Sequence, residues 1–222
     1  MLKAIIFDMD GVIAETEIKK FAHIKKLAEA KGNKRLDEKK HLRKFIGMPS
    51  KEFLLGFFGK SISKKEIEDI VNKRRREYSK FPEKYINEMK GIRMLSSKLA
   101  KKYILAIASG AQKETVMKTI SHLGILGYFK IIVTGSEIKK NKPNPEIYLR
   151  ALKKMNLKSD ECLAVEDSET GIAAAKGAGI RVIGKRNKIY EEFGYKAALS
   201  KADFVIDELE DLPKILGKVA VK

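Results

Sequence analysis

Residues 5–12, with the sequence IIFDMDGV, constrain the fold of this chain more than any other stretch. Residues 4–7 are all apolar, which is typical of a buried strand, and side chains two positions apart in a strand point to the same side. Asp8 and Asp10 could therefore converge on one reacting centre, and Gly11 permits a sharp turn directly after them. In open α/β sheets, ligands bind beyond the carboxyl ends of the strands. The two aspartates are expected at such an end.

Paired carboxylates can divide the work of a reaction when one stays ionised and the other carries a proton. We predict that Asp8 is the nucleophile and that Asp10 is the general acid and base. The alternative is that both are surface turn residues, because Asp is common in turns. The stretch alone favours neither interpretation, so the rest of the chain has to decide.

Length and composition indicate a folded, soluble protein. With 222 residues, 44% of them hydrophobic, the chain can bury a substantial core as one large domain or two modest ones. No apolar run is long enough to span a bilayer, and the chain reaches Asp8 too soon for a secretory signal. We expect a cytoplasmic monomer that binds no membrane. The single cysteine, Cys162, can form no internal disulfide, and we interpret it as a small core residue rather than a reactive thiol.

The charge is strongly positive, at +18, and this excess is concentrated in one part of the chain. Residues 19–90 contain 22 basic and 10 acidic residues, a net charge of +12. Such a charge attracts anionic partners, nucleic acid among them. A chain rich in Lys and Glu and poor in Gln and Cys is also typical of thermophiles, where the charges form a solvated surface. We favour the solvated surface.

Residues 16–89 read as an all-helical insertion directly behind the two aspartates. Phe21, Ile24 and Ala28 recur at helical spacing, with Thr16 as the expected N-cap and Asn33 among the residues expected to end this helix. Three further helical stripes cover residues 42–46, 53–58 and 67–78. No strand is predicted within the insertion.

The remainder, residues 1–15 and 90–222, alternates apolar strands with helices. Predicted strands cover residues 3–7, 104–108, 131–134, 162–165, 180–183 and 204–206. This alternation, with short connections, predicts a Rossmann-like, doubly wound parallel sheet with helices on both faces. We therefore predict an α/β catalytic core with the helical segment inserted as a cap domain.

Two loops that follow predicted strands carry groups suited to anions. Ser109 and Gly110 precede a helix predicted over residues 113–123, so a hydroxyl and free backbone N–H groups lie at a helix N-terminus. Ser109 could equally be only a helix cap. Lys142 lies in a loop stiffened by Pro143 and Pro145, although a lysine in a basic chain is usually solvated.

A third loop carries two adjacent acids. Glu166 and Asp167 end a predicted buried strand, with Ser168 and Gly171 behind them. Carboxylate oxygens are the ligands that Mg²⁺ prefers. Asp167 could instead be only a helix cap.

Taken together, these motifs resemble the haloacid dehalogenase superfamily, in particular its capped phosphatase branch, which includes β-phosphoglucomutase and phosphoglycolate phosphatase. The first motif corresponds to residues 7–12, the second to Ser109, the third to residues 142–145 and the fourth to residues 166–171. Each motif alone is weak. Four in the right order, each at a predicted strand end, favour a functional role for Asp8 over the turn interpretation.

The resemblance implies the roles of the site residues. Asp8 would attack a phosphate monoester, and Asp10 would protonate the leaving alcohol and then activate water. Mg²⁺ would be held by the carboxylates of Asp8 and Asp167 and by the backbone carbonyl of Asp10, with Glu166 as a further ligand or as the partner of one. The phosphoryl oxygens would be bound by Ser109, Gly110 and Lys142.

Differences between this sequence and the motifs of other superfamily members bear on which reaction is expected. True dehalogenases of the superfamily lack an acid two residues after the nucleophile, so Asp10 argues against carbon–halogen cleavage. Phosphonate hydrolases of the superfamily use a cap lysine that forms a Schiff base. The insertion here contains many lysines, so this activity stays open as an alternative. Glu15 replaces a usual aspartate, which leaves the hydrogen bonding of the cap hinge open.

The sugar-phosphate mutases of the family have a histidine where this chain has Lys20. Their cap lysine and arginine would fall at Ile46 and Ser50, around Gly47, and these side chains cannot hold a second phosphate. Lys44 or Lys51 could compensate. We predict a Mg²⁺-dependent phosphatase acting on a small phosphorylated metabolite, with the mutase as the alternative. A nucleic-acid-binding protein is the third hypothesis, but the chain lacks a recognisable binding motif, so we expect no specific nucleic-acid partner.

Overall fold

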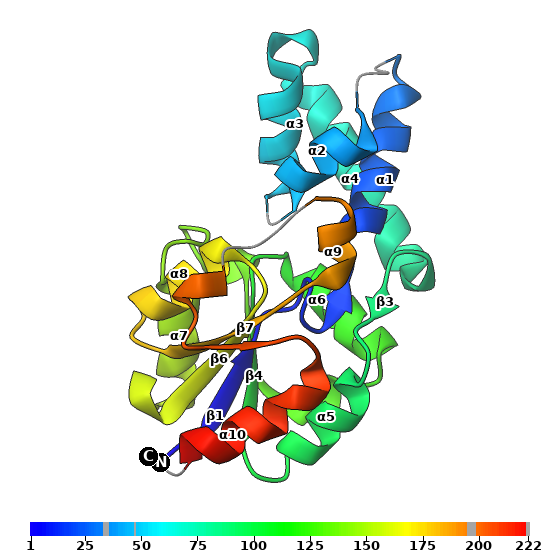
Figure 1. The fold of residues 1–222 in the computed structure, drawn as a ribbon. Helices are drawn as coiled ribbons and strands as arrows, with labels where there is room; N and C mark the ends of the chain where they lie inside the picture. Colours follow the sequence, from blue (N-terminus) through cyan, green and yellow to red (C-terminus); the bar gives the residue numbers. More distant parts are fainter. Residues whose placement is uncertain (33–35, 47, 195–198, 221–222) are drawn as a thin grey trace. The chain divides into compact units, whose positions relative to one another are not determined.

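In a computed structural model, the predicted apolar runs pair as a six-stranded parallel sheet in the order β5-β4-β1-β6-β7-β8 (Figure 1). The strands are β1 (Ala4–Phe7), β4 (Ile104–Ser109), β5 (Phe129–Thr134), β6 (Cys162–Glu166), β7 (Arg181–Lys185) and β8 (Phe204–Ile206). The predicted α/β class with a parallel sheet is confirmed.

Strand β1 lies in the middle of this sheet because it has no polar side chain to expose. All four of its residues are completely buried. Its neighbours are β4 and β6, and Phe7 is level with Ile107 on one side and Val165 on the other. A strand covered on both faces reads as a continuous apolar run, which is what the sequence shows. The residue after Phe7 therefore emerges at the centre of the sheet edge.

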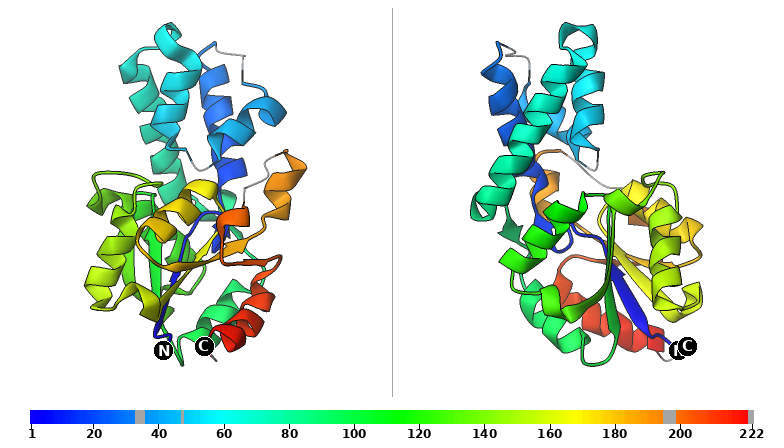
Figure 2. Two further views of the ribbon diagram at one scale, coloured as in Figure 1. Left: turned by 60° about the vertical axis from the view of Figure 1, so that its left-hand side comes forward. Right: turned by 180° about the vertical axis from the view of Figure 1, so that it is seen from behind.

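Helices cover both faces of the sheet. Helices α7 (Glu146–Met155) and α8 (Glu169–Gly177) lie on one face, and α5 (Ile92–Leu99) and α10 (Leu212–Ala220) lie on the other (Figure 2). Helix α6 (Lys113–His122) follows β4. On the first face, Ile6 of β1 belongs to the same buried apolar cluster as Ile147 and Ile172. Burial of this cluster holds the layers together.

The structure describes residues 1–32, 36–46, 48–194 and 199–220, and the chain divides into two compact units. The first comprises Met1–Ala14, Glu88–Asn187 and Ala197–Lys222, and the second comprises Glu15–Asn87 and Lys188–Lys196. The chain passes between the units within a two-stranded sheet of β2 (Ala14–Glu15) and β3 (Asn87–Glu88). No strand was expected as far as Met89, so β3 corrects that prediction. Two residues are too few to show a strand pattern in the sequence.

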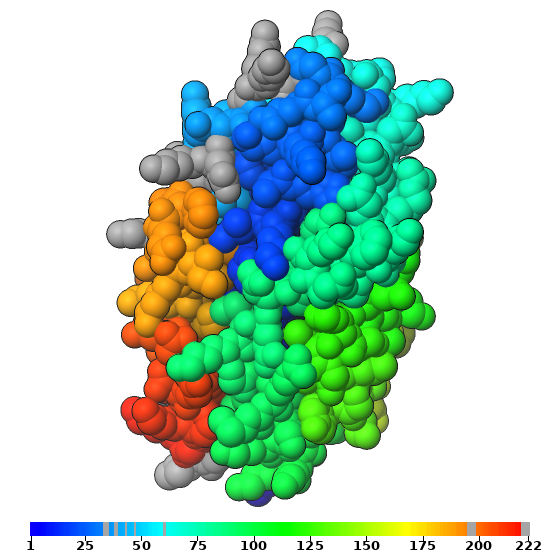
Figure 3. Space-filling view, turned by 90° about the vertical axis from the view of Figure 1, so that its right-hand side faces the viewer, coloured from blue at the N-terminus to red at the C-terminus, as the bar shows by residue number. Residues whose placement is uncertain are grey.

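The second unit contains the four α-helices that the stripes predict and a fifth, α9, that they do not. They are α1 (Glu17–Glu29), α2 (Glu38–Phe45), α3 (Ser50–Phe58), α4 (Lys64–Lys80) and α9 (Lys188–Glu192). Helices α1 and α4 pack side by side, as the space-filling view shows (Figure 3). Phe21, Phe45 and Phe53 meet edge to face, with ring centroids 5.1–5.9 Å apart. Phe193, which follows α9, packs against this core although it comes late in the sequence.

The N-terminus of α1 is capped by Glu15 rather than by the hydroxyl of Thr16. Thr16 occupies the N-cap position, but its side chain makes no capping hydrogen bond. Oε1 of Glu15 accepts a hydrogen bond from the backbone N–H of Ile18 at 2.9 Å, and Oε2 accepts one from Asn87 at 3.4 Å. The buried Glu15 carboxylate therefore joins the start of α1 to β3. Of the residues predicted to end α1, Lys31 and Gly32 form a turn just beyond it, and Asn33 lies outside the described residues.

In the parts of the chain that the structure describes, every helix is too short or too polar to span a lipid bilayer.

We expect Glu15→Ala to lower the free energy of unfolding by about 1–2 kcal/mol, because a helix cap and a buried acceptor are lost. Glu15→Gln keeps an oxygen that can accept from Ile18, so it should cost much less. Urea unfolding of both variants, with the exposed Glu83→Ala as control, measures the difference. Equal losses for Ala and Gln would contradict the capping role.

Candidate active site

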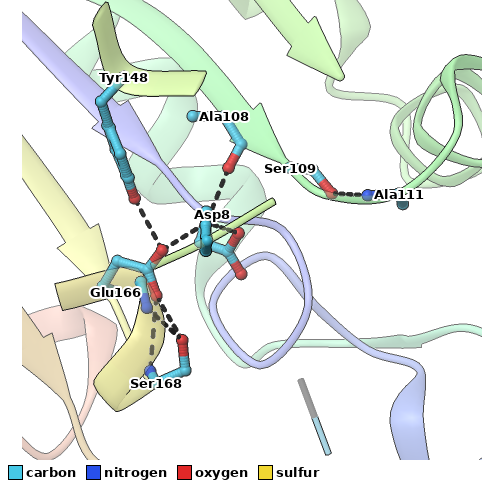
Figure 4. A network of polar contacts seen from close by, with 9 residues as sticks. Asp8, Ala108, Ser109, Ala111, Tyr148, Glu166 and Ser168 are labelled. Atoms are coloured by element: carbon cyan, nitrogen blue, oxygen red, sulfur yellow. Dashed lines mark hydrogen bonds and ion pairs between the residues drawn. The ribbon is translucent and has the colours of Figure 1, made fainter. Parts of the chain in front are cut away.

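The polar residues at the carboxyl ends of β1, β4 and β6 gather at one edge of the sheet (Figure 4). Asp8 directly follows β1, and its backbone N–H donates to the carbonyl of Val165 at 2.9 Å, which continues the ladder to β6. Glu166 is the last residue of β6, and Ser109 is the last residue of β4. Parallel pairing therefore brings three segments that are far apart in the sequence to one place.

Lys142 is the cation at the centre of this group. Its Nζ lies 2.6 Å from Oδ1 of Asp8 and 2.5 Å from Oε1 of Glu166, and it donates to the carbonyl of Ala108 at 3.0 Å. An ammonium group has three protons to donate, so each has an acceptor. Only 11% of the Lys142 side chain is exposed. The solvated-lysine interpretation is therefore wrong for this residue.

Burial acts to lower the pKa of Lys142, but the carboxylates of Asp8 and Glu166 outweigh it and raise that pKa above its ordinary value. A raised pKa keeps the ammonium group protonated at neutral pH. Its side chain thus presents a fixed positive charge beside Asp8.

Glu166 is completely buried and is held from several sides. Besides Lys142, the hydroxyl of Tyr148 donates to Oε1 at 2.7 Å, and the hydroxyl of Ser168 donates to Oε2 at 3.1 Å. Gly171 lies so close that a Cβ on it would be 2.0 Å from the Glu166 carboxylate. Burial and the Glu166 charge raise the pKa of Tyr148, so its hydroxyl stays protonated and can donate. Glu166 is therefore fixed in a single orientation.

Asp167 packs against the loop that follows β1. Gly11 has φ +81°, and a Cβ there would lie 1.7 Å from Oδ2 of Asp167. The amide of Asn187, after β7, donates to Oδ2 of Asp167 at 3.4 Å and to the carbonyl of Gly11 at 3.5 Å. Gly11 is thus required both by its backbone conformation and by the closeness of Asp167. The helix cap behind Asp167 is Ser168, whose hydroxyl accepts from the N–H of Gly171, so Asp167 is not that cap.

Burial raises the pKa of two carboxyl groups here. The pKa of Asp8 is raised to about 7, with the Lys142 charge acting in the opposite direction. Burial, together with the charges of Asp8 and Glu166, raises the pKa of Asp167 well above its ordinary value. Among the described residues, Asp8, Glu166 and Asp167 form the group of acids whose ligand oxygens all lie within 4.8 Å of one another. A hard divalent cation such as Mg²⁺ fits this oxygen donor set and would favour the ionised forms.

The other predicted residues lie close by, but their roles stay predictions. Asp10 is half-buried in the turn after β1, bridged to Ala14. The hydroxyl of Ser109 is buried and accepts from the N–H of Ala111 at 3.2 Å. Gln112, not Ser109, occupies the N-cap position of α6. Gly110 is exposed. The structure thus brings Lys142 into contact with Asp8 and Glu166 and places a carboxylate oxygen of Asp167 within 4.8 Å of theirs. The other predicted residues lie at the same edge of the sheet.

Sequence reasoning missed Tyr148 and Asn187. Tyr148 lies in the buried stripe of α7, where its side chain reads as core, and nothing local shows that its hydroxyl reaches Glu166. Asn187 was detectable, because it is a polar residue just beyond the carboxyl end of β7. The rule that identified Ser109 and Glu166 applies equally to it.

Comparisons with known proteins agree with this geometry. The model of the haloacid dehalogenase-like hydrolase family matches residues 5–185. The phosphorylated carbohydrates phosphatase of Thermotoga maritima is 30% identical over 220 residues, which cover 98% of this chain and 100% of that protein. The β-phosphoglucomutase of Bacillus subtilis is 28% identical, covering 95% of this chain and 92% of that one. The crystal structure of CbbY from Rhodobacter sphaeroides in complex with phosphate is 25% identical, covers 96% of both chains and has a TM-score of 0.80.

We expect Lys142→Ala to reduce phosphate release by about 10²–10³-fold, the usual effect of removing one donor that stabilises charge in the transition state. Lys139 and Lys140 are exposed in the same loop, so Lys139→Ala and Lys140→Ala are matched controls and should stay close to wild type. Circular dichroism melting checks that each variant is folded. Similar activities for all three variants would remove Lys142 from the site.

Proposed function

Because this chain belongs to the haloacid dehalogenase-like hydrolase family, we propose that it is a Mg²⁺-dependent phosphatase that hydrolyses a small phosphorylated metabolite through an aspartyl-phosphate on Asp8. The enzyme class predicted from the motifs, a phosphoric monoester hydrolase, agrees with the names of its relatives. The substrate and the roles of individual residues are proposals.

The contact between Lys142 and Asp8 carries this proposal. A phosphate dianion is repelled by an aspartate, so the reaction needs fixed positive charge beside the nucleophile. Lys142 lies 2.6 Å from Asp8, buried and protonated, with Glu166 holding it from the other side. Phosphoryl transfer depends chiefly on positioning and charge stabilisation, and this arrangement supplies both.

In the first step, a carboxylate oxygen of Asp8 forms a bond to phosphorus and the bond to the ester oxygen breaks. Asp10 gives its proton to the departing alcohol. In the second step, Asp10 takes a proton from water, whose oxygen attacks phosphorus while the bond to Asp8 breaks. Phosphate leaves, and both aspartates return to their initial states. Ser109, Gly110 and Lys142 hold the phosphoryl oxygens during both steps.

When bound, Mg²⁺ would offset the charge of the phosphate and of the acidic cluster. Asp8, Asp167 and the backbone carbonyl of Asp10 would hold it. Both oxygens of Glu166 already accept hydrogen bonds, from Lys142 and Tyr148 on one side and from Ser168 on the other. We therefore assign Glu166 chiefly to the orientation of Lys142.

Hydrolysis is favoured over mutase action by the positions where a mutase would hold a second phosphate. The Ile46 side chain packs against the apolar core of the helical unit. Lys20, where the mutases have a histidine, forms an ion pair with Glu17. Ser50 is the first residue of α3, and Gly47 lies outside the described residues. Ile46 therefore offers no group that could bind a second phosphate.

The assignment of residues 16–89 as a cap on a core of residues 1–15 and 90–222 remains part of the proposal, with the segment Lys188–Lys196 now grouped with the helical unit. We assign the choice of leaving group to the helical unit, because in this fold the core positions the phosphate.

A screen of phosphorylated metabolites, with Mg²⁺ or with chelator, tests the function directly. Release of phosphate that requires Mg²⁺ is expected. Tight nucleic-acid binding at physiological salt without any phosphate release would favour the nucleic-acid hypothesis.

Asp8→Asn should give a folded but inactive protein. The amide has nearly the same shape, but its neutral oxygen is a poor nucleophile and a poor ligand for Mg²⁺. Phosphate release is measured at Mg²⁺ concentrations at which the variant is shown to bind the metal. Substantial activity in the metal-loaded variant would exclude Asp8 as the nucleophile.

Asp10→Asn keeps the nucleophile but loses proton transfer, so we expect turnover to fall by about 10²–10⁴-fold. Alkyl phosphates, whose alcohols need a proton on leaving, should lose more than activated aryl phosphates. Steady-state rates for one substrate of each kind measure the difference. Equal losses for both would argue against Asp10 as the acid.

A further inference from the structure

The loop after β5 lies against the loop after β4, where Ser109 and Gly110 are expected to bind phosphate. Strands β4 and β5 are neighbours, with Ser109 level with Thr134. Immediately beyond them, the backbone N–H of Gly135 donates to the carbonyl of Ala111 at 2.8 Å. The two loops are therefore joined backbone to backbone at the sheet edge.

Gly135 allows this contact because it has no side chain. A Cβ on Gly135 would lie 2.1 Å from the carbonyl oxygen of Gly110 and 3.2 Å from that of Ala111. Both atoms belong to the backbone, so they cannot move aside as the end of a flexible side chain could. Any larger residue at 135 has to displace the loop that carries Ser109.

Ser136 adds a second connection between the loops. Its hydroxyl accepts from the backbone N–H of Lys113 at 3.0 Å and donates to Oε1 of Gln112 at 3.0 Å. Gln112, the N-cap residue of α6, makes no capping hydrogen bond with its own side chain. The start of α6 is thus fixed by a residue 23 positions later in the sequence.

The loop after β5 is also bonded to its own strand and to helix α7. Glu137 accepts from the backbone N–H of Thr134 at 3.2 Å and pairs with Nζ of Lys154, in α7, at 2.5 Å. Helix α7 also carries Tyr148, which contacts Glu166. The loop after β5 is therefore tied to the same helix that supports the acidic cluster.

We infer that Gly135 and Ser136 are positioning residues, which hold the loop of Ser109 and Gly110 in the conformation that binds the phosphoryl group. This inference rests on the proposed phosphatase function. Among the described hydrogen bonds and ion pairs, none links Gly135 or Ser136 to Asp8, Lys142 or the acidic pair at residues 166–167. The two residues therefore act through the phosphate-binding loop.

The test measures the dissociation constant of inorganic phosphate, by calorimetry in the presence of Mg²⁺, alongside the thermal midpoint. Gly135→Ala should weaken phosphate binding by about tenfold or more, since a backbone segment that carries ligand donors must shift. Gly127→Ala is the matched control, because a Cβ there meets nothing within 4 Å. It should bind phosphate as the wild type does.

Ser136→Ala removes exposed hydrogen bonds, so a loss of about threefold is expected, and Ser136→Thr, which keeps the hydroxyl, should restore binding. Faster amide hydrogen exchange over residues 110–113 in the alanine variant alone would support the same role. If Gly135→Ala fails to fold, the comparison of Ser136→Ala with Ser136→Thr tests the positioning role. Wild-type phosphate affinity in Ser136→Ala, with unchanged exchange, would overturn the inference while the phosphatase proposal stands. Absence of phosphate binding and of phosphatase activity in the wild type would overturn both.

Discussion

The buried contact of Lys142 with two carboxylates is the interaction on which the rest of the site depends. Asp8 and Glu166 are both carried to the sheet edge by strands, and without a cation between them their charges would repel in a place shielded from water. Lys142 reaches them from a different loop, so the contact also fixes that loop against the sheet. One ammonium group therefore joins the segments after β1, after β5 and at the end of β6 into a single structure.

The surroundings of this contact are held rigid by glycines, which allow close packing, as much as by hydrogen bonds. Gly11, Gly135 and Gly171 each face another group so closely that a single methyl group would collide with it. Gly11 and Gly135 lie in the connections after β1 and β5, and Gly171 lies in the first turn of α8. In each case the neighbour is a carboxylate or a backbone carbonyl of the site. These close contacts keep the polar groups of the site packed against one another. They do not depend on flexible side chains that would have to reorganise.

The sequence predicts the parallel sheet and the family correctly because both depend on local signals: apolar runs and the polar residues at their ends. Glu15 and Thr16 show the limit of such signals, since a cap preference at one position does not reveal that its neighbour takes the bond. Tyr148 shows another limit, because a buried aromatic residue looks the same whether or not its hydroxyl has a partner. Sequence also assigned Phe193 to the α/β core, whereas its side chain packs with the helical unit. Such contacts between residues distant in sequence cannot be read from spacing.

Phe193 has a consequence for how this protein can be recombined with its relatives. The segment Lys188–Lys196 belongs to the helical unit, although about one hundred residues separate it from the rest of that unit. A helical unit grafted from another member of the family as one contiguous insertion would arrive without the piece that covers part of its apolar core. Modular exchange of the helical unit therefore has to transfer two stretches of chain together.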